Sequence, residues 1–266
     1  MKTAAIILLV FVIVCSFYFF RRRNKTHAEA SEDLIDKSLL AKHVNFYSGL
    51  DDVGKREFEE AVHFFLSHTR ITGVDTAVTT LDRMLIAAGA VIPIFHFKKW
   101  RYYNLREVLL YSDAINHNFE SKGNSDRNIL GMVGSGVYNN MMFLSKASLH
   151  SGFENKSDKH NTTIHEFVHL LDKADGDTDG IPDLLIDKKY VLPWVNMIHE
   201  NMQQIARGKS DIDSYAFTNK AEFFAVAAEY FFEQPALLEA KHPELFKMLA
   251  NMFELPDTER NNESGL

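Results

Sequence analysis

The chain has 266 residues, which is enough for a membrane anchor and one sizeable globular domain, or for two small domains. Its net charge is −7 and no broad basic stripe is present, so we expect no direct binding of nucleic acid. Cys15 is the only cysteine, which excludes a disulfide within the chain and a zinc site built on thiolates. Any bound metal must therefore be held by histidine and carboxylate side chains.

An uncharged apolar run of 17 residues, residues 4–20, lies near the N-terminus. As a helix rising about 1.5 Å per residue, it would span most of a hydrocarbon core of about 30 Å, and it predicts a transmembrane anchor. One alternative is a cleaved signal peptide, which is disfavoured because arginines end the run and no A-x-A-like site is present there. Another is a lipidated Cys15, which is disfavoured because the bulky Val14 precedes it.

Basic residues flank this run unevenly. Lys2 precedes it, whereas four of the five residues at 21–25 are arginine or lysine. The positive-inside rule then places the C-terminal side in the cytoplasm. We therefore expect a single-pass protein of the inner (cytoplasmic) membrane, whose main domain lies in the cytoplasm.

The chain up to residue 161 alternates helical and extended patterns. A first helix is expected over residues 33–47, and Asp51 and Asp52 are a plausible N-cap for a second. A strongly apolar helix is predicted over Thr79–Ile94 and ends near Pro93. A short strand is expected at residues 70–74, buried strands at 108–111 and 141–145, and a loop at 156–161.

Four helical stretches follow, at residues 162–173, 192–207, 220–232 and 235–253. We therefore predict an α+β fold with a helix-rich C-terminal half, preceded by one transmembrane helix. The predicted division is an anchor with its basic flank (1–25), a tether and first helix (26–50), one main domain (51–255) and a polar tail (256–266).

The segment from His165 to His169 reads H-E-x-x-H. Side chains at positions i and i+4 lie on the same face of a helix, so both imidazoles can reach one ion, and Glu166 can reach its bound water. The alternative is a solvated helix face with two surface histidines. The apolar neighbours Val168 and Leu171 argue against full exposure.

A catalytic zinc usually has three protein ligands and one open position for water. Asp172 lies three residues after His169 and is one candidate, although we expect it rather to orient an imidazole N–H. The metzincin pattern requires glycine at 172 and histidine at 175. The chain has Asp172 and Asp175 there, which excludes that class.

A better source of the third ligand is the apolar helix predicted at residues 220–232. Glu222 and Glu229 are seven residues apart and lie on one face of it. Buried carboxylates are costly unless they are paired or bound to a metal. The alternative is that both lie at a helix edge in contact with water.

Three separated segments, residues 161–172, 210–216 and 221–232, resemble the Mlc titration factor A family of zinc peptidases. The similarity covers most of residues 50–250, with the motifs in the same order. It implies a zincin-like metallopeptidase domain with one Zn²⁺ per chain. It also implies that the ligands are His165, His169 and Glu222, the first glutamate of the last segment.

The family's site is similar to that of anthrax lethal factor, in which a tyrosine seven residues before the ligand glutamate faces the metal. Tyr215 has that spacing here. The typical family protein is soluble, so the anchor expected at residues 4–20 departs from the pattern.

We therefore expect a gluzincin-like zinc peptidase that acts on a peptide or protein. Glu166 would be the general base, Tyr215 would stabilise the oxyanion, and Asp172 and Glu229 would orient the ligands. The family resemblance also implies weak aminopeptidase-type activity and binding to a sugar-responsive transcriptional repressor. A regulatory protein with a vestigial site is therefore the first alternative, and a membrane-anchored structural protein with an incidental motif is the second.

Overall fold

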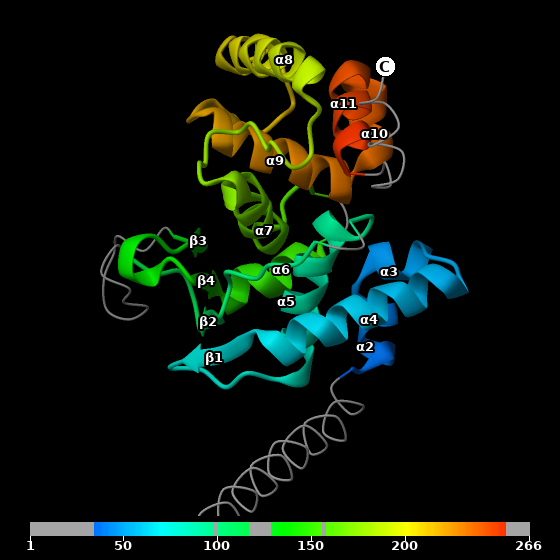
Figure 1. Ribbon diagram of the computed structural model, residues 1–266, viewed down its shortest axis with the longest axis vertical. Coiled ribbons are helices and arrows are strands. Elements are labelled where there is room, and N and C mark those ends of the chain that lie inside the picture. Colours follow the sequence, from blue (N-terminus) through cyan, green and yellow to red (C-terminus); the bar gives the residue numbers. More distant parts are fainter. Residues whose placement is uncertain (1–34, 98–99, 117–128, 156–157, 254–266) are drawn as a thin grey trace, which may run out of the picture. The chain divides into compact units, whose positions relative to one another are not determined.

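The structure is a computed structural model that describes residues 35–97, 100–116, 129–155 and 158–253. The anchor predicted at residues 4–20 and the tail at 256–266 lie outside this part of the chain. Within the described residues, no helix is long and apolar enough to span a membrane. From Lys37 onward the described residues belong to one unit, drawn in Figure 1.

Four short strands form a mixed sheet in the order β1-β2-β4-β3. β2 runs parallel to both β1 and β4, whereas β3 runs antiparallel to β4 and lies at the edge. The three predicted strands are confirmed, but β3 was not predicted, because three residues give too short a pattern. The strands are β1 (Arg70–Val74), β2 (Glu107–Tyr111), β3 (Gly131–Val133) and β4 (Met141–Ser145).

The helix expected over residues 33–47 is, in the described part, two short helices, α2 (Lys37–His43) and α3 (Asn45–Gly49). The helix breaks because Val44 adopts an extended conformation between them. Leu40 and Val44 are buried, so α2 and α3 belong to the same unit as the later elements.

Two predicted helix starts are confirmed by their caps. Asp51 accepts a hydrogen bond from the backbone N–H of Gly54 and begins α4 (Asp52–His68). Thr79 and Asp82 form a capping box at the start of α5 (Thr80–Val91), which leads into η2 (Ile92–Ile94).

The C-terminal half is helical, as predicted, with three differences. The helix α6 was not predicted, α8 begins four residues earlier than expected, and the last helix is interrupted at His242 because a residue before proline disfavours helical geometry. The elements are η3 (Gly136–Tyr138), α6 (Lys146–Glu154), α7 (Thr162–Asp172), η4 (Lys173–Asp175), α8 (Lys188–Ala206), η5 (Ser214–Phe217), α9 (Lys220–Glu233), α10 (Pro235–Lys241) and α11 (Pro243–Phe253).

Helices α7 and α9 pack against each other at the centre of this half (Figure 1). The rings of Phe223 and Phe224 on α9 contact Trp194 of α8, with centroids 6.1 and 6.0 Å apart. On the other side of α7, Gly89 of α5 allows a close crossing, because a Cβ there would lie 2.4 Å from Thr163. The described residues thus form a mixed, helix-rich α/β domain with α7 held between α5 and α9.

Candidate metal centre

Helix α7 is buried along most of its length, and its cap fixes where it begins. The side chain of Asn161 accepts a hydrogen bond from the backbone N–H of Ile164. Phe167 faces the core, where its ring contacts Phe65 and Tyr102 at centroid distances of 5.6 and 5.0 Å. This packing fixes the rotation of α7, so the opposite face, with His165, is directed towards α9.

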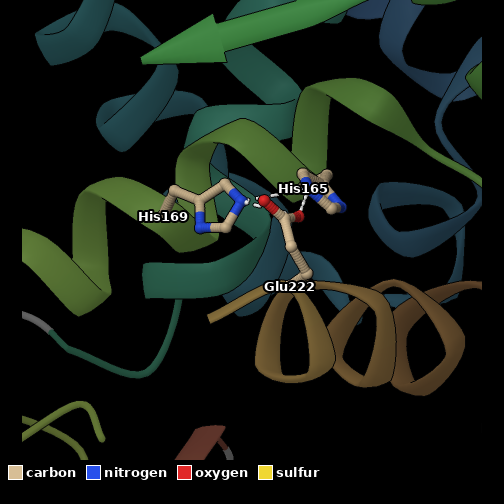
Figure 2. A group of neighbouring side chains, drawn as sticks. All are labelled: His165, His169 and Glu222. Atoms are coloured by element: carbon tan, nitrogen blue, oxygen red, sulfur yellow. Dashed lines mark hydrogen bonds and ion pairs between the residues drawn. The ribbon is translucent and has the colours of Figure 1, made fainter. Parts of the chain in front are cut away.

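Three side chains from α7 and α9 converge on one point (Figure 2). The Nε2 atoms of His165 and His169 are 3.0 Å apart, and Oε2 of Glu222 lies 3.0 and 3.3 Å from them, respectively. Among the residues that the structure describes, this is the one group of three potential ligands whose donor atoms gather so closely. Tetrahedral zinc with bonds of about 2.0–2.1 Å requires neighbouring ligands to be about 3.3 Å apart, so the spacing fits the metal.

The charges of the group also suit a cation. Burial by itself would lower the pKa of His165, but hydrogen bonds to Glu222 and Glu229 raise it to about 10. Burial would raise the pKa of Glu222, yet hydrogen bonds from His165 and His169 lower it to about 2. His165 therefore keeps its proton and Glu222 stays ionised, and a divalent cation could take the place of the imidazolium proton that faces Glu222.

Glu229, on the same helix as Glu222, contacts the ring nitrogen of His165 that is directed away from Glu222. Its Oε1 atom lies 2.6 Å from Nδ1 of His165, and its Oε2 accepts a hydrogen bond of 2.7 Å from the backbone N–H of Asn161. A carboxylate in this place assigns the proton of the imidazole to Nδ1 and leaves Nε2 to face the ligand group.

Asp172 is fully buried and lies outside the three-residue group. Its Oδ2 accepts a hydrogen bond from the backbone N–H of Gly180, and burial raises its pKa to about 6. Among the described residues, its Oδ1 and the Nδ1 of His169 both lack a hydrogen-bond partner. A role for Asp172 in orienting His169 thus stays a prediction.

Glu166 lies on the cleft side of α7 but is only 5% exposed, and burial raises its pKa. The edge strand β3 passes directly over it. A Cβ on Gly131 would lie 2.7 Å from Cγ of Glu166 and 2.8 Å from Thr162, so only glycine permits this approach. Gly131 was not predicted from the sequence, because a glycine before two apolar residues is not a distinctive signal.

A second contact holds the other end of β3 to the same helix. Lys173, just after α7, donates hydrogen bonds to the carbonyl oxygen of Gly134 and to Oδ1 of Asn139, at 3.1 and 2.6 Å. Both acceptors lie in the turn between β3 and β4. The gap between the edge strand and the ligand helix is therefore fixed at both ends.

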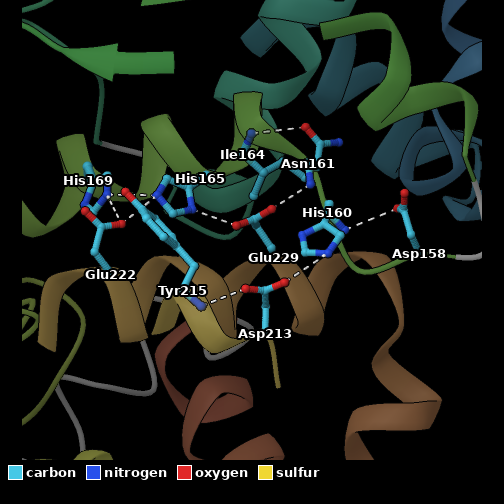
Figure 3. Close-up of polar contacts among 10 residues, drawn as sticks. All are labelled: Asp158, His160, Asn161, Ile164, His165, His169, Asp213, Tyr215, Glu222 and Glu229. Atoms are coloured by element: carbon cyan, nitrogen blue, oxygen red, sulfur yellow. Dashed lines mark hydrogen bonds and ion pairs between the residues drawn. The ribbon is translucent and has the colours of Figure 1, made fainter. Parts of the chain in front are cut away.

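Tyr215 projects from η5 beside His165 and Glu222 (Figure 3). Its ring centroid is 6.1 Å from that of His165, and the residue is 54% exposed. Burial and the nearby carboxylates of Glu222 and Glu166 raise its pKa, so the hydroxyl keeps its proton. Asp213 accepts a hydrogen bond from the backbone N–H of Tyr215 and lies 3.5 Å from His160, which connects η5 to the chain entering α7.

Asp211, which the sequence analysis did not identify, anchors the same loop. Its carboxylate accepts hydrogen bonds from Lys159 at 2.6 Å, Tyr230 at 2.8 Å and Lys241 at 2.9 Å, and its Oδ1 lies 2.7 Å from Nε2 of His242. Burial alone would raise the pKa of Asp211, but these donors hold it well below its usual range. The loop that carries Tyr215 is thus fixed to α9, α10 and the segment before α7.

The group formed by His165, His169 and Glu222 lines a cleft of about 980 Å³. Residues 129–133 form one wall, whereas Tyr215, Glu222 and Val226 belong to the other. The cleft therefore combines an apolar wall with a ligand group, a buried carboxylate and an exposed phenol.

The sequence matches known proteins over most of its length. A family model described as glucose-regulated metallo-peptidase M90 matches residues 18–254. An uncharacterized protein of Synechocystis sp. is 26% identical over 227 residues, which cover 82% of this chain and 82% of that protein. Mlc titration factor A of Klebsiella pneumoniae is 33% identical over 114 residues, and that of Escherichia fergusonii is 39% identical over 101 residues. These two alignments cover 40% and 35% of this chain, and 42% and 37% of the relatives.

Proposed function

Because the chain belongs to the M90 family of glucose-regulated metallo-peptidases, to which its Mlc titration factor A relatives point, we propose that it is a zinc-dependent peptidase of the gluzincin type. The observation that carries the proposal is the convergence of His165, His169 and Glu222, with donor atoms 3.0–3.3 Å apart. These three residues would hold one Zn²⁺ in a zincin-like domain.

In the proposed mechanism, Glu166 transfers the proton and Tyr215 stabilises the oxyanion beside the metal. Zinc, when bound, supplies a Lewis acid and lowers the pKa of water towards about 7. Glu166 takes the proton of the attacking water and passes it to the leaving amine, a task suited to a buried carboxylate with a raised pKa. The hydroxyl of Tyr215 donates a hydrogen bond to the oxyanion.

The edge strand offers a place for an extended substrate. Leu130 accepts a hydrogen bond from Ser145, and Gly134 donates one to Met141, both on the β4 side. Alternate residues of an antiparallel strand bond to the same neighbour, so the backbone groups of Gly131 and Val133 face away from β4. A peptide or protein segment could pair with them beside Glu166.

The test is hydrolysis of a peptide library by the zinc-loaded full-length protein, scored for cleavage both at N-termini and within chains. Glu166→Gln should lower the rate about a thousandfold, as expected for loss of a general base, and keep the zinc. Glu239→Gln, at an exposed position, is the matched control. An undiminished rate of hydrolysis in Glu166→Gln would contradict the mechanism.

A second candidate function is binding of a transcriptional repressor, because two relatives carry the name of a factor that titrates Mlc. The chain spans about two fifths of those relatives' length, so we keep this as the alternative. Repressor binding that persists in Glu222→Ala, together with an inactive zinc-loaded wild type, would favour it.

We further propose that residues 4–20 anchor the domain in the inner membrane and leave it in the cytoplasm. The support is the apolar run and the basic residues that follow it. A periplasmic reporter fused after Lys25 should be inactive, and an active one would contradict this topology.

A further inference from the structure

A second cavity, of about 150 Å³, lies behind the ligand helix. Its lining includes Phe65 and Tyr102, the two rings that pack on Phe167 of α7. Phe167 is two residues from both His165 and His169, about 200° around the helix from either. The cavity is therefore separate from the metal cleft and is placed against the opposite face of α7.

The cavity has an apolar floor and a cationic mouth. Its buried lining residues are almost all apolar and belong to α4 and its C-cap, α5, η2 and the segment before β2. The exposed lining residues are His68, Tyr103 and Arg106, and Arg101 is half-buried beside them. The guanidinium carbon of Arg101 lies 5.0 Å from the ring centroid of Phe64, another lining residue. The floor is formed by Phe65, Thr69, Ala90, Val91, Ile94 and Leu105.

Charge distinguishes this cavity from the rest of the molecule. The whole chain has a net charge of −7, yet the lining contains two arginines and none of its described residues is acidic. A guanidinium presents N–H donors in a planar fork that matches a carboxylate. Arg101 already donates a hydrogen bond of 2.6 Å to the carbonyl oxygen of Trp100, so an anion at the mouth would meet mainly the exposed guanidinium of Arg106.

The volume of the cavity limits the apolar part of the ligand. An apolar cavity of about 150 Å³ holds one benzene-sized ring. We propose that this cavity binds a small aromatic carboxylate, with the ring on the floor and the carboxylate at Arg106. This site is independent of the proposed peptidase activity.

Calorimetric titration of the full-length protein with benzoate tests the assignment, with benzamide as the uncharged ligand of the same shape. We expect one benzoate per chain, bound about tenfold more tightly than benzamide, because the amide lacks the charge-assisted bonds. Two variants should each lower the affinity for benzoate about tenfold. Ala61→Leu narrows the cavity, and Arg106→Gln removes one guanidinium at an exposed position.

Two controls locate the site. Lys247→Gln, at an exposed position away from the lining, should leave benzoate binding unchanged. His169→Ala should also leave it unchanged, which separates this cavity from a carboxylate bound at the metal centre. The proposal is overturned by equal affinity for benzoate and benzamide, by no measurable benzoate binding, or by binding that is lost in His169→Ala but survives Arg106→Gln and Ala61→Leu.

Discussion

Oε1 of Glu229 lies 2.6 Å from Nδ1 of His165, across 64 residues of sequence. The other ring nitrogen of the same imidazole faces Glu222, seven residues earlier on α9. Two carboxylates that lie two turns apart on α9 thus contact the two ring nitrogens of His165. Glu222 is a candidate metal ligand, and Glu229 orients the imidazole. This relationship explains why two glutamates with this spacing lie within a helix whose interior is otherwise nearly all apolar.

Replacing Glu229 by glutamine should weaken zinc binding about tenfold to a hundredfold, as is usual for a group that orients a metal ligand. Glutamine retains one carbonyl oxygen and cannot accept hydrogen bonds from both His165 and Asn161. Zinc affinity measured by competition with a chelator checks this, with Glu239→Gln as the exposed control. An unchanged affinity would mean that the contact does not orient His165.

Replacing Lys173 by methionine should loosen the edge strand without affecting the metal. The ammonium group connects α7 to the turn after β3, and its bonds to Gly134 and Asn139 would be lost. We expect amide exchange of Gly134, whose N–H donates to the carbonyl oxygen of Met141, to rise about tenfold and zinc affinity to stay the same. Lys173→Arg should restore much of the protection, and Lys247→Met should have no effect. Unaltered exchange in Lys173→Met would show that the turn is held by other contacts.

Replacing Glu233 by glutamine should change how stability depends on pH. Burial raises the pKa of Glu233 from 4.5 to about 7, while its Oε1 accepts a hydrogen bond of 2.8 Å from Asn161. Between those two values the folded protein binds more protons than the unfolded chain, so this group makes the free energy of unfolding fall as the pH rises. Thermal unfolding at pH 5 and pH 8 should therefore show a smaller loss of Tm in Glu233→Gln than in the wild type. A loss equal to that of the wild type would contradict the assignment to Glu233.

Local patterns in the sequence predicted much of the fold. The caps at Asp51 and Thr79 depend on residues within three positions of them, and the strand at residues 70–74 is bounded as predicted. Elements with short or mixed patterns were missed, namely β3 and α6. The break before Pro243 had a signal, since a residue before proline disfavours a helix, but the apolar spacing on both sides favoured one long helix.

The convergence of the three candidate ligands could be predicted from the sequence, because helix periodicity places His165 and His169 together and the family resemblance selected Glu222. The residues that position this group could not be predicted in the same way. The contacts of Asp211 with Lys159 and of Gly131 with Glu166 join segments 35 or more residues apart, and no local pattern specifies such pairs. They follow from the packing of α7 against α9 and β3, which a single sequence does not reveal.

The most direct test of the metal centre is the zinc content of the purified full-length protein, wild type against Glu222→Ala. We predict one equivalent of zinc in the wild type and loss of most of it in the variant, because Oε2 of Glu222 is the oxygen that meets both imidazoles. Zinc retained in full by Glu222→Ala, or none in the wild type, would contradict the three-ligand centre.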